Sequence, residues 1–230
     1  MSVLEDPNVR LDNVVFKSLL DSDNTFLTSV FEEIEIKNAI WECGSGKSPA
    51  PHRLSFSSIK KHWKNLKKDV IAAIQSFHNE GSIPRGYNAS FITLIPKSDN
   101  PQVLDKYRPI PLVGCIYKTL SKVLSIRVKK VIDKGIDVLQ STFLSQRGIL
   151  DIVLVANEVV DELKRKKGSG MIIKLDYEKA YDSISWDFLF YMMDKLGFCR
   201  KWIEWIRVCI ESSSISVLVN GSPTKRIQSI

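Results

Sequence analysis

The longest regular pattern in this chain is a helical repeat of apolar residues between positions 55 and 79. Successive members are three or four positions apart, which is the spacing that puts side chains on one face of an α-helix. They are Phe56, Ile59, Trp63, Leu66, Val70, Ile74 and Phe77. Lysines occupy the other faces between positions 60 and 68, and Gly81 is a natural stop signal. The pattern predicts one long amphipathic helix, or two in line.

Strands are expected both in the middle of the chain and near its end. Residues 90–96 and 108–114 predict two strands joined by a polar turn that contains proline. Residues 171–175 form a short apolar segment typical of a strand. Residues 214–219 alternate as a strand does, and the Asn-Gly pair after them is a strong hairpin signal.

Further helices fill the intervals between these strands. A capping-box pattern of Ser29 and Glu32 predicts a helix that begins at Ser29 and ends near Gly44. The remaining helical segments are residues 116–133, 150–166, 186–196 and 200–211. The expected order is helices, a strand pair, more helices and a strand–helix–helix–strand unit. It lacks regular β-α alternation, so we expect an α+β fold.

Charge and cysteine content narrow the possible functions only moderately. Lysine and arginine outnumber acidic residues 33 to 26, a net charge of +7, which suits a binder of the nucleic-acid backbone and equally many other basic proteins. The four cysteines are scattered and, like the three histidines, lack metal-ligand spacing, so we expect reduced thiols. With no apolar leader or membrane-length apolar run, the chain is expected to be nuclear or cytoplasmic, with no secretion or membrane signal.

The strongest local signal for chemistry is the segment KLDYEKAYDSISW, residues 174–186. Its apolar start would deliver Asp176 at the carboxyl end of a strand, where a carboxylate can hold Mg²⁺ together with waters and substrate phosphates. On spacing alone, a strand-end aspartate that only bonds nearby backbone N–H groups remains an equal alternative. For Asp182, a position near a helix cap is the preferred interpretation.

This segment closely resembles motif A of reverse transcriptases, specifically of LINE-type (non-LTR) retrotransposons of the kind abundant in plant genomes. Residues 92–124 resemble the family's fingers segment, with its I-P-K and Y-R-P-I-S-L core. Residues 143–160 resemble the following F-x-x-G-R-x-I-x-D block, and residues 217–223 the hairpin before motif B. The likeness covers about residues 28–230 in the family's order.

The resemblance implies reverse-transcriptase-like fingers and an incomplete palm of a right-hand polymerase. We expect a loose lead-in over residues 1–27, a fingers-like subdomain over 28–168 and the first half of a palm over 169–230. The implied activity is RNA-directed DNA polymerisation, with Mg²⁺, dNTPs, an RNA template and a DNA primer. No membrane partner is implied.

Site residues follow from the resemblance position by position. Asp176 matches the catalytic, metal-binding aspartate, and the backbone carbonyl of Tyr177 is an added metal ligand. Tyr181 matches the aromatic gate that excludes a nucleotide 2′-hydroxyl, with an ordinary core tyrosine as the alternative. Lys97 and Arg108 match the fingers positions that bind the incoming triphosphate, and Arg147 matches a position near the template.

Several departures from the family pattern bear on activity. The loop S-P-G-P-D-G is replaced by residues 48–53, SPAPHR, while Pro111 stands where serine is usual and Gln146 where glycine is usual. Residues 1–230 stop before motif B and before the paired aspartates of motif C. We therefore expect the chain to have little or no polymerase activity alone. The alternatives are a non-catalytic RNA-binding module and a translated relic without function.

Overall fold

The computed structural model describes residues 11, 13–44, 54–84, 86–136, 149–167, 170–171 and 184–228. The chain divides into two compact units. The first comprises Asp21–Val131 and Cys199–Ile230, and the second comprises Met1–Leu20 and Ile132–Phe198. The larger, first unit is therefore assembled from two stretches that are far apart in the sequence.

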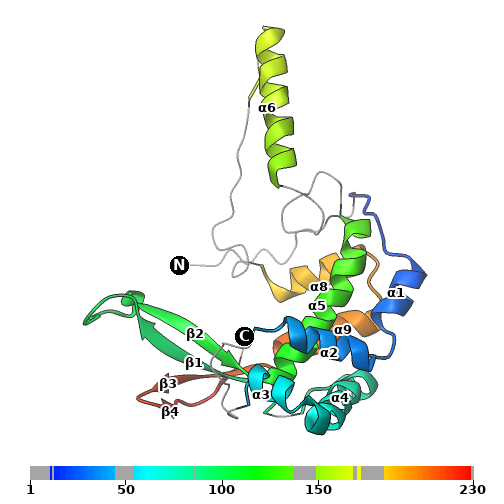
Figure 1. Ribbon diagram of the computed structural model, residues 1–230. Helices are drawn as coiled ribbons and strands as arrows, with labels where there is room; N and C mark the ends of the chain where they lie inside the picture. The colour runs from blue at the N-terminus through cyan, green and yellow to red at the C-terminus, as the bar shows by residue number, and fades with distance from the viewer. Residues whose placement is uncertain are drawn as a thin grey trace. The chain divides into compact units, whose positions relative to one another are not determined.

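Figure 1 shows the elements of both units. The first unit begins with helices α1 (Asp21–Leu27), α2 (Glu33–Glu42), α3 (Phe56–Lys61) and α4 (Trp63–Glu80). Strand β1 (Ala89–Pro96), the 3₁₀ turn η1 (Leu104–Lys106), strand β2 (Tyr107–Val113) and helix α5 (Cys115–Gly135) follow, although the end of α5 belongs to the second unit. Helix α9 (Arg200–Glu211) and strands β3 (Ser214–Val219), β4 (Ser222–Pro223) and β5 (Ile227–Gln228) complete the first unit. The second unit contains α6 (Ile149–Arg165) and α8 (Trp186–Lys195).

The predicted amphipathic helix forms as two helices in line, α3 and α4. His62 separates them because its backbone (φ −108°, ψ 24°) is not helical. Ser55 caps α3 by accepting the Ser58 N–H at 3.1 Å. Gly81 ends α4 in the left-handed conformation, φ 64°, and donates its N–H to the carbonyl of Phe77, so the predicted stop is confirmed.

The start of the chain departs from the sequence prediction. The helix expected from Ser29 begins instead at Glu33, and Glu32 at its N-cap makes no side-chain capping bond. Residues 21–27, inside the stretch expected to be a lead-in, form α1. The Ser29 hydroxyl donates to the carbonyl of Phe26 rather than capping the next helix. The capping-box prediction was wrong because Ser29 closes α1 instead of opening α2.

A small mixed sheet lies in the first unit, with strand order β2-β1-β3-β4 and β5 beside β3. The expected pair β1 and β2 is antiparallel, with Ile95 opposite Arg108. Strand β3 pairs with β1 in the parallel sense. The predicted Asn-Gly hairpin is confirmed, because Asn220 and Gly221 have φ of 50° and 80° between β3 and β4. The described residues therefore have a mixed α+β fold.

Asn88 joins the end of α9 to the start of β3. Its side-chain amide donates to the carbonyl of Cys209 at 3.2 Å and to the Ser212 hydroxyl at 2.9 Å. Its backbone carbonyl accepts the N–H of Ser214. This buried residue therefore fixes where β3 begins beside β1.

Tryptophans of α9 occupy the centre of the first unit's core. Trp202 and Trp205 are buried, with their ring centroids 6.0 Å apart. Trp205 also contacts the rings of Phe31, Phe77 and His78 at centroid distances of 5.3 to 5.5 Å. This aromatic cluster connects α9 to α4 and to the α1–α2 connection, so the two sequence-distant stretches share one core.

The cysteines are free thiols. Burial raises the pKa of the Cys209 thiol to about 12 and also raises that of Cys115. The Cys115 thiol donates to the carbonyl of Leu54 at 3.1 Å. None of the helices in the described ranges combines the length and the apolar character that a membrane span requires.

In the second unit, the turn after α8 packs against residues 18 and 19. Gly197 has φ of 78°, and a side chain there would lie 3.0 Å from the Ser18 side chain. Beside it, the Leu19 N–H donates to the carbonyl of Leu196 at 2.9 Å. Helices α6 and α8 confirm the predicted helical segments 150–166 and 186–196 to within one residue at each end. Apart from Met171, the predicted strand 171–175 lies outside the described residues.

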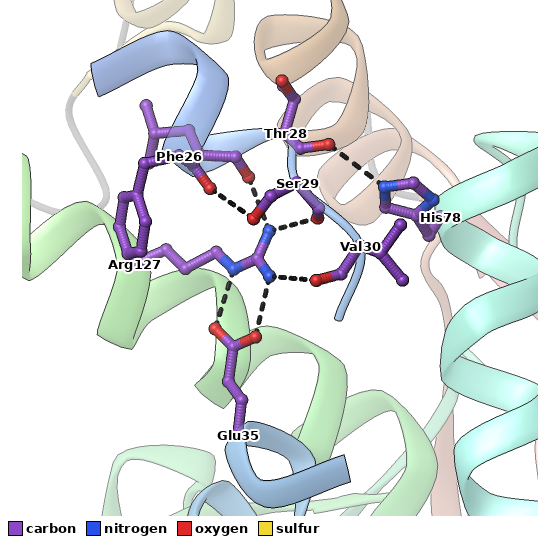
Figure 2. Close-up of polar contacts among 8 residues, drawn as sticks. Phe26, Thr28, Ser29, Val30, Glu35, His78 and Arg127 are labelled. Carbon is purple, nitrogen blue, oxygen red and sulfur yellow. Dashed lines mark hydrogen bonds and ion pairs between the residues drawn. The ribbon is translucent and has the colours of Figure 1, made fainter. Parts of the chain in front are cut away.

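Arg127 of α5 is buried at the centre of a polar cluster in the first unit, shown in Figure 2. Its Nε and one terminal nitrogen donate to the two carboxylate oxygens of Glu35, each at 2.7 Å. The other N–H groups donate to the carbonyls of Leu27, Ser29 and Val30, at 2.9, 2.7 and 3.0 Å. All five guanidinium donors are thus satisfied. The guanidinium carbon also lies 4.4 Å from the ring centroid of Phe31.

We predict that Arg127→Ala costs about 3–5 kcal/mol of unfolding free energy, because it leaves a partly buried carboxylate and three carbonyls without their donor. Urea unfolding followed by circular dichroism measures the loss. The control is Arg207→Ala, which removes a more exposed arginine paired with Glu211 and should cost about 1 kcal/mol or less. Equal losses in the two variants would contradict this account of the cluster.

Two prolines of β2 remove backbone N–H donors from the outer edge of the sheet. The N–H of Lys97 donates to the carbonyl of Lys106 at 2.7 Å, which marks a hydrogen-bonded pair at the tip of the β1–β2 hairpin. Hydrogen-bonded and non-hydrogen-bonded pairs alternate in an antiparallel ladder, so Pro109 and Pro111 fall on positions whose backbone nitrogens face away from β1. Pro111 therefore removes no bond between β1 and β2, and the N–H it lacks belongs to the edge that pairs with no other described strand.

We predict that Pro109→Thr with Pro111→Thr increases self-association, since two outward N–H donors return to an exposed edge. Sedimentation velocity should show a larger oligomeric fraction at equal concentration. Pro101→Thr, a change in the loop between the same strands, is the control and should leave the fraction unchanged. An unchanged monomer in the double variant would show that the prolines do not protect this edge.

Candidate functional site

The β1–β2 hairpin carries two of the predicted site residues, Lys97 and Arg108. Lys97 follows the last residue of β1, and Arg108 is the second residue of β2. The Lys97 ammonium donates to the carbonyl of Asp105 at 2.8 Å, and its backbone N–H bonds Lys106. These bonds tie the end of β1 to η1, which closes the hairpin. Figure 1 shows the hairpin as the green pair of arrows labelled β1 and β2, with α3 beside its base.

The register of the hairpin puts the two cations on the same face. Arg108 is directly opposite Ile95, and Lys97 lies two residues beyond Ile95 on the same strand. Because side chains alternate between the faces of a sheet, Lys97 and Arg108 project from one face near the tip. Both residues are exposed. Within the part of the chain that the structure describes, neither pairs with a carboxylate.

Two such cations suit a polyphosphate ligand. Arginine offers a planar pair of donors that match two phosphate oxygens, while lysine acts as a point charge. Lys106, directly opposite Lys97 at the tip, adds a third positive charge that the sequence analysis did not single out. Lys106 could not be recognised as a neighbour of Lys97 from the sequence, because only the hairpin register puts the two residues opposite each other.

The other predicted site residues, Asp176, Tyr177, Tyr181 and Arg147, lie outside the described residues, as does Asp182. Their expected roles therefore stay predictions. Among the residues that are described, there is no group of three or more histidine, cysteine, aspartate or glutamate side chains that could hold a metal ion.

Two hollows among the described residues of the first unit do not suit an anion. One hollow, of about 350 Å³, lies beside Arg127 and is also lined by Glu32, Glu35 and Glu42. Every donor of Arg127 is already used, so the cation that remains at this hollow is Lys130, beside the three glutamates. A smaller one, of about 140 Å³, is mostly apolar and is lined by Ile74, Phe77, Tyr117 and their neighbours. Burial raises the pKa of Tyr117, whose hydroxyl donates to the carbonyl of Cys209.

Comparison with known proteins agrees with the motifs. Residues 95–229, more than half of the chain, match the model of the reverse transcriptase (RNA-dependent DNA polymerase) family. This range contains all six residues predicted to form the site.

Curated relatives point in the same direction. A Transposon TX1 149 kDa protein from Xenopus laevis is 24% identical over 83% of this chain, and the match covers 14% of that protein. The Pol polyprotein of retrotransposable element R2 from Popillia japonica is 22% identical over 64% of the chain and 20% of its own length. The corresponding polyprotein of element R2DM from Drosophila melanogaster is 23% identical over 61% of the chain and 13% of its own length.

The chain thus spans a fifth or less of the length of these relatives. All three are animal proteins, so a plant-type origin stays a prediction. The family match and the retrotransposon relatives lead to one conclusion: the chain belongs to the reverse transcriptase family, as part of a reverse transcriptase domain of the LINE-type, non-LTR class.

Proposed function

We propose that this chain supplies the fingers, over residues 28–168, and the first half of the palm, over 169–230, of an RNA-directed DNA polymerase. Residues 1–27 lead into the fingers. The ligands would be an RNA template, a DNA primer and dNTPs, which reverse transcriptases use in general. The observation that carries the proposal is the family match over residues 95–229, which includes a hairpin with two exposed cations on one face.

In this proposal the hairpin binds the incoming nucleotide. Arg108 would pair with two oxygens of the triphosphate and Lys97 would neutralise a third, which orients the nucleotide without any proton transfer by the protein. Lys97 would exchange its present bond to the carbonyl of Asp105 for the phosphate. Tyr181 would exclude a 2′-hydroxyl, and Arg147 would contact the template.

Reverse transcriptases use divalent metal ions, and we propose Mg²⁺ here. Asp176 and the backbone carbonyl of Tyr177 would hold it, since a carboxylate and a carbonyl oxygen are ligands that Mg²⁺ prefers. When bound, the metal supplies activation of the primer hydroxyl and neutralisation of the leaving pyrophosphate. Residues 1–230 contain neither the motif B sequence nor the paired aspartates of motif C, so we propose that they do not polymerise DNA by themselves.

A non-catalytic RNA-binding module is the second candidate function. The exposed lysines Lys61, Lys64 and Lys68 favour it, because among the described residues they have no carboxylate partner. RNA binding that falls with rising salt and is unaffected by Asp176→Ala would support this candidate. RNA binding alone does not separate it from the polymerase, but nucleotide binding does.

We expect Lys97→Gln and Arg108→Gln each to weaken dNTP binding by roughly tenfold, since each removes a charge-assisted contact to phosphate. Equilibrium dialysis with a labelled dNTP and Mg²⁺ measures the affinity. Lys129→Gln, an exposed lysine of α5, is the matched control and should change little. If Lys129→Gln weakens binding as much as the hairpin variants do, the cations act only through net charge and the hairpin site is wrong.

Purified residues 1–230 should incorporate no dNTP in a primer-extension assay on an RNA template with Mg²⁺, because the metal-binding carboxylates expected in motif C are missing from this sequence. An active reverse transcriptase run in parallel confirms that the substrates are competent. Incorporation that disappears in Asp176→Asn would overturn the expected inactivity and would show that Asp176 is required for it.

A further inference from the structure

The smaller hollow of the first unit, of about 140 Å³, is a pocket between α4, α5 and the connection that leads from α4 to β1. The buried residues at its deep end are Ile74, Phe77 and Leu120. The exposed residues at its mouth are Ser82, Pro84 and Tyr87. Protein interiors rarely leave a space larger than a water molecule, so the walls of this pocket lack contacts that a ligand would supply.

The chemistry of the pocket walls selects against a charged ligand. The described residues that line the pocket carry no charged side chain. Two of the polar groups are already bonded, since the Tyr117 hydroxyl donates to the carbonyl of Cys209 at 2.8 Å and the Ser76 hydroxyl donates to Glu80 at 2.9 Å. Burial also raises the pKa of Tyr117, as expected in surroundings that disfavour a charge. A charged ligand would lose its hydration here and gain no partner in return.

The volume and the aromatic walls of the pocket favour a single ring. An apolar protein cavity of about 150 Å³ stays dry and binds benzene, so a pocket of about 140 Å³ suits one six-membered ring. The aromatic side chains that line it are Phe77, Tyr87 and Tyr117. Aromatic rings attract one another in edge-to-face and offset arrangements, so an aromatic ring fits these walls better than a saturated ring of equal size.

The mouth of the pocket is better suited to a small molecule than to a protein partner. A stable protein interface buries about 800 Å² on each partner and has an apolar centre. Among the described lining residues, Tyr87, at 42%, is the most exposed large apolar side chain. The mouth therefore offers little apolar area beyond the opening itself, whereas the buried deep end can enclose a ring.

We infer that this pocket, the α4–α5 pocket, binds a small uncharged molecule with one aromatic ring. The ring contacts Ile74, Phe77 and Leu120, and a polar substituent emerges at the mouth beside Ser82. The connection that forms the mouth leads directly to Asn88, which fixes β3 beside β1, so a bound ring stabilises the base of the sheet. The inference does not depend on the proposed function, because none of these residues belongs to the nucleotide site.

Titration of phenol into the full 230-residue chain, followed by NMR, tests the inference. We expect a Kd on the order of 1 mM or lower for a ligand of this size. Tenfold excess over the Kd should raise the Tm by about 3–6 °C. Intermolecular NOEs should connect the ring protons of phenol to the methyl groups of Ile74, Ile116 and Leu120. An absence of saturable binding, or NOEs confined to methyl groups elsewhere, would overturn the inference.

Two adjacent alanines of α4 provide matched variants. Ala73 lines the pocket, whereas Ala72 is exposed and is not one of its lining residues. Ala73→Leu should weaken phenol binding by at least about tenfold, since the larger side chain fills the space of the ring. Ala72→Leu makes the same chemical change and should bind phenol as the unmodified chain does. Equal affinities of the two variants would count against the pocket. The NOEs are measured on the unmodified chain, so they decide the question even if Ala73→Leu fails to fold.

Two further ligands test the chemical class. Benzoate has the ring of phenol and a carboxylate, and it should bind at least about tenfold more weakly than phenol because its charge finds no partner. Cyclohexanol has a similar size without aromatic character, and it should bind about 2- to 13-fold more weakly, the value of an aromatic pair. Benzoate binding as tight as that of phenol would overturn the uncharged class, and cyclohexanol binding as tight would overturn the aromatic preference.

Discussion

Arg127 holds the connection between α1 and α2 in place because all five of its N–H donors are used there and on Glu35. Apolar helix packing alone tolerates small shifts, whereas a guanidinium with a bidentate carboxylate and three carbonyls fits one arrangement. A buried ion pair contributes little net stability against an apolar core, so we attribute to Arg127 the alignment of α5 with α2 rather than a large gain in free energy. That alignment also puts Phe31 beside Trp205, and so connects the cluster to the core.

Much of the local structure could be predicted from the sequence because its causes are local. The apolar repeat of α4, its stop at Gly81 and the turn at Asn220 each depend on residues within a few positions. The break at His62 was left open, since one helix and two in line have the same apolar spacing. Ser29 misled the prediction because a serine near a helix end satisfies either the helix behind it or the one ahead.

Features that depend on distant partners could not be predicted in the same way. Arg127 has the spacing of the buried face of α5, with Leu120, Val123 and Val131, yet a cation in a basic helix is usually solvated. Only Glu35 and the α1–α2 carbonyls, about a hundred positions earlier, make its burial favourable. The parallel pairing of β1 with β3 also has no local signal. For Lys97 and Arg108, the motif indicated the residues, and the hairpin register was needed to put them on one face.

The parallel pairing of β1 with β3 has a consequence for synthesis of the chain on the ribosome. Strand β1 ends at Pro96 and β3 begins at Ser214, so the partner of its inner edge is made about 120 residues later. At a translation speed of roughly 5–20 residues per second, that interval is on the order of 6–24 s. The prolines of β2 protect only the outer edge, and Trp202 and Trp205, which fill the core, also arrive late. For those seconds the nascent helices lack the part of the core that the two tryptophans fill, and the inner edge of β1 lacks its partner strand.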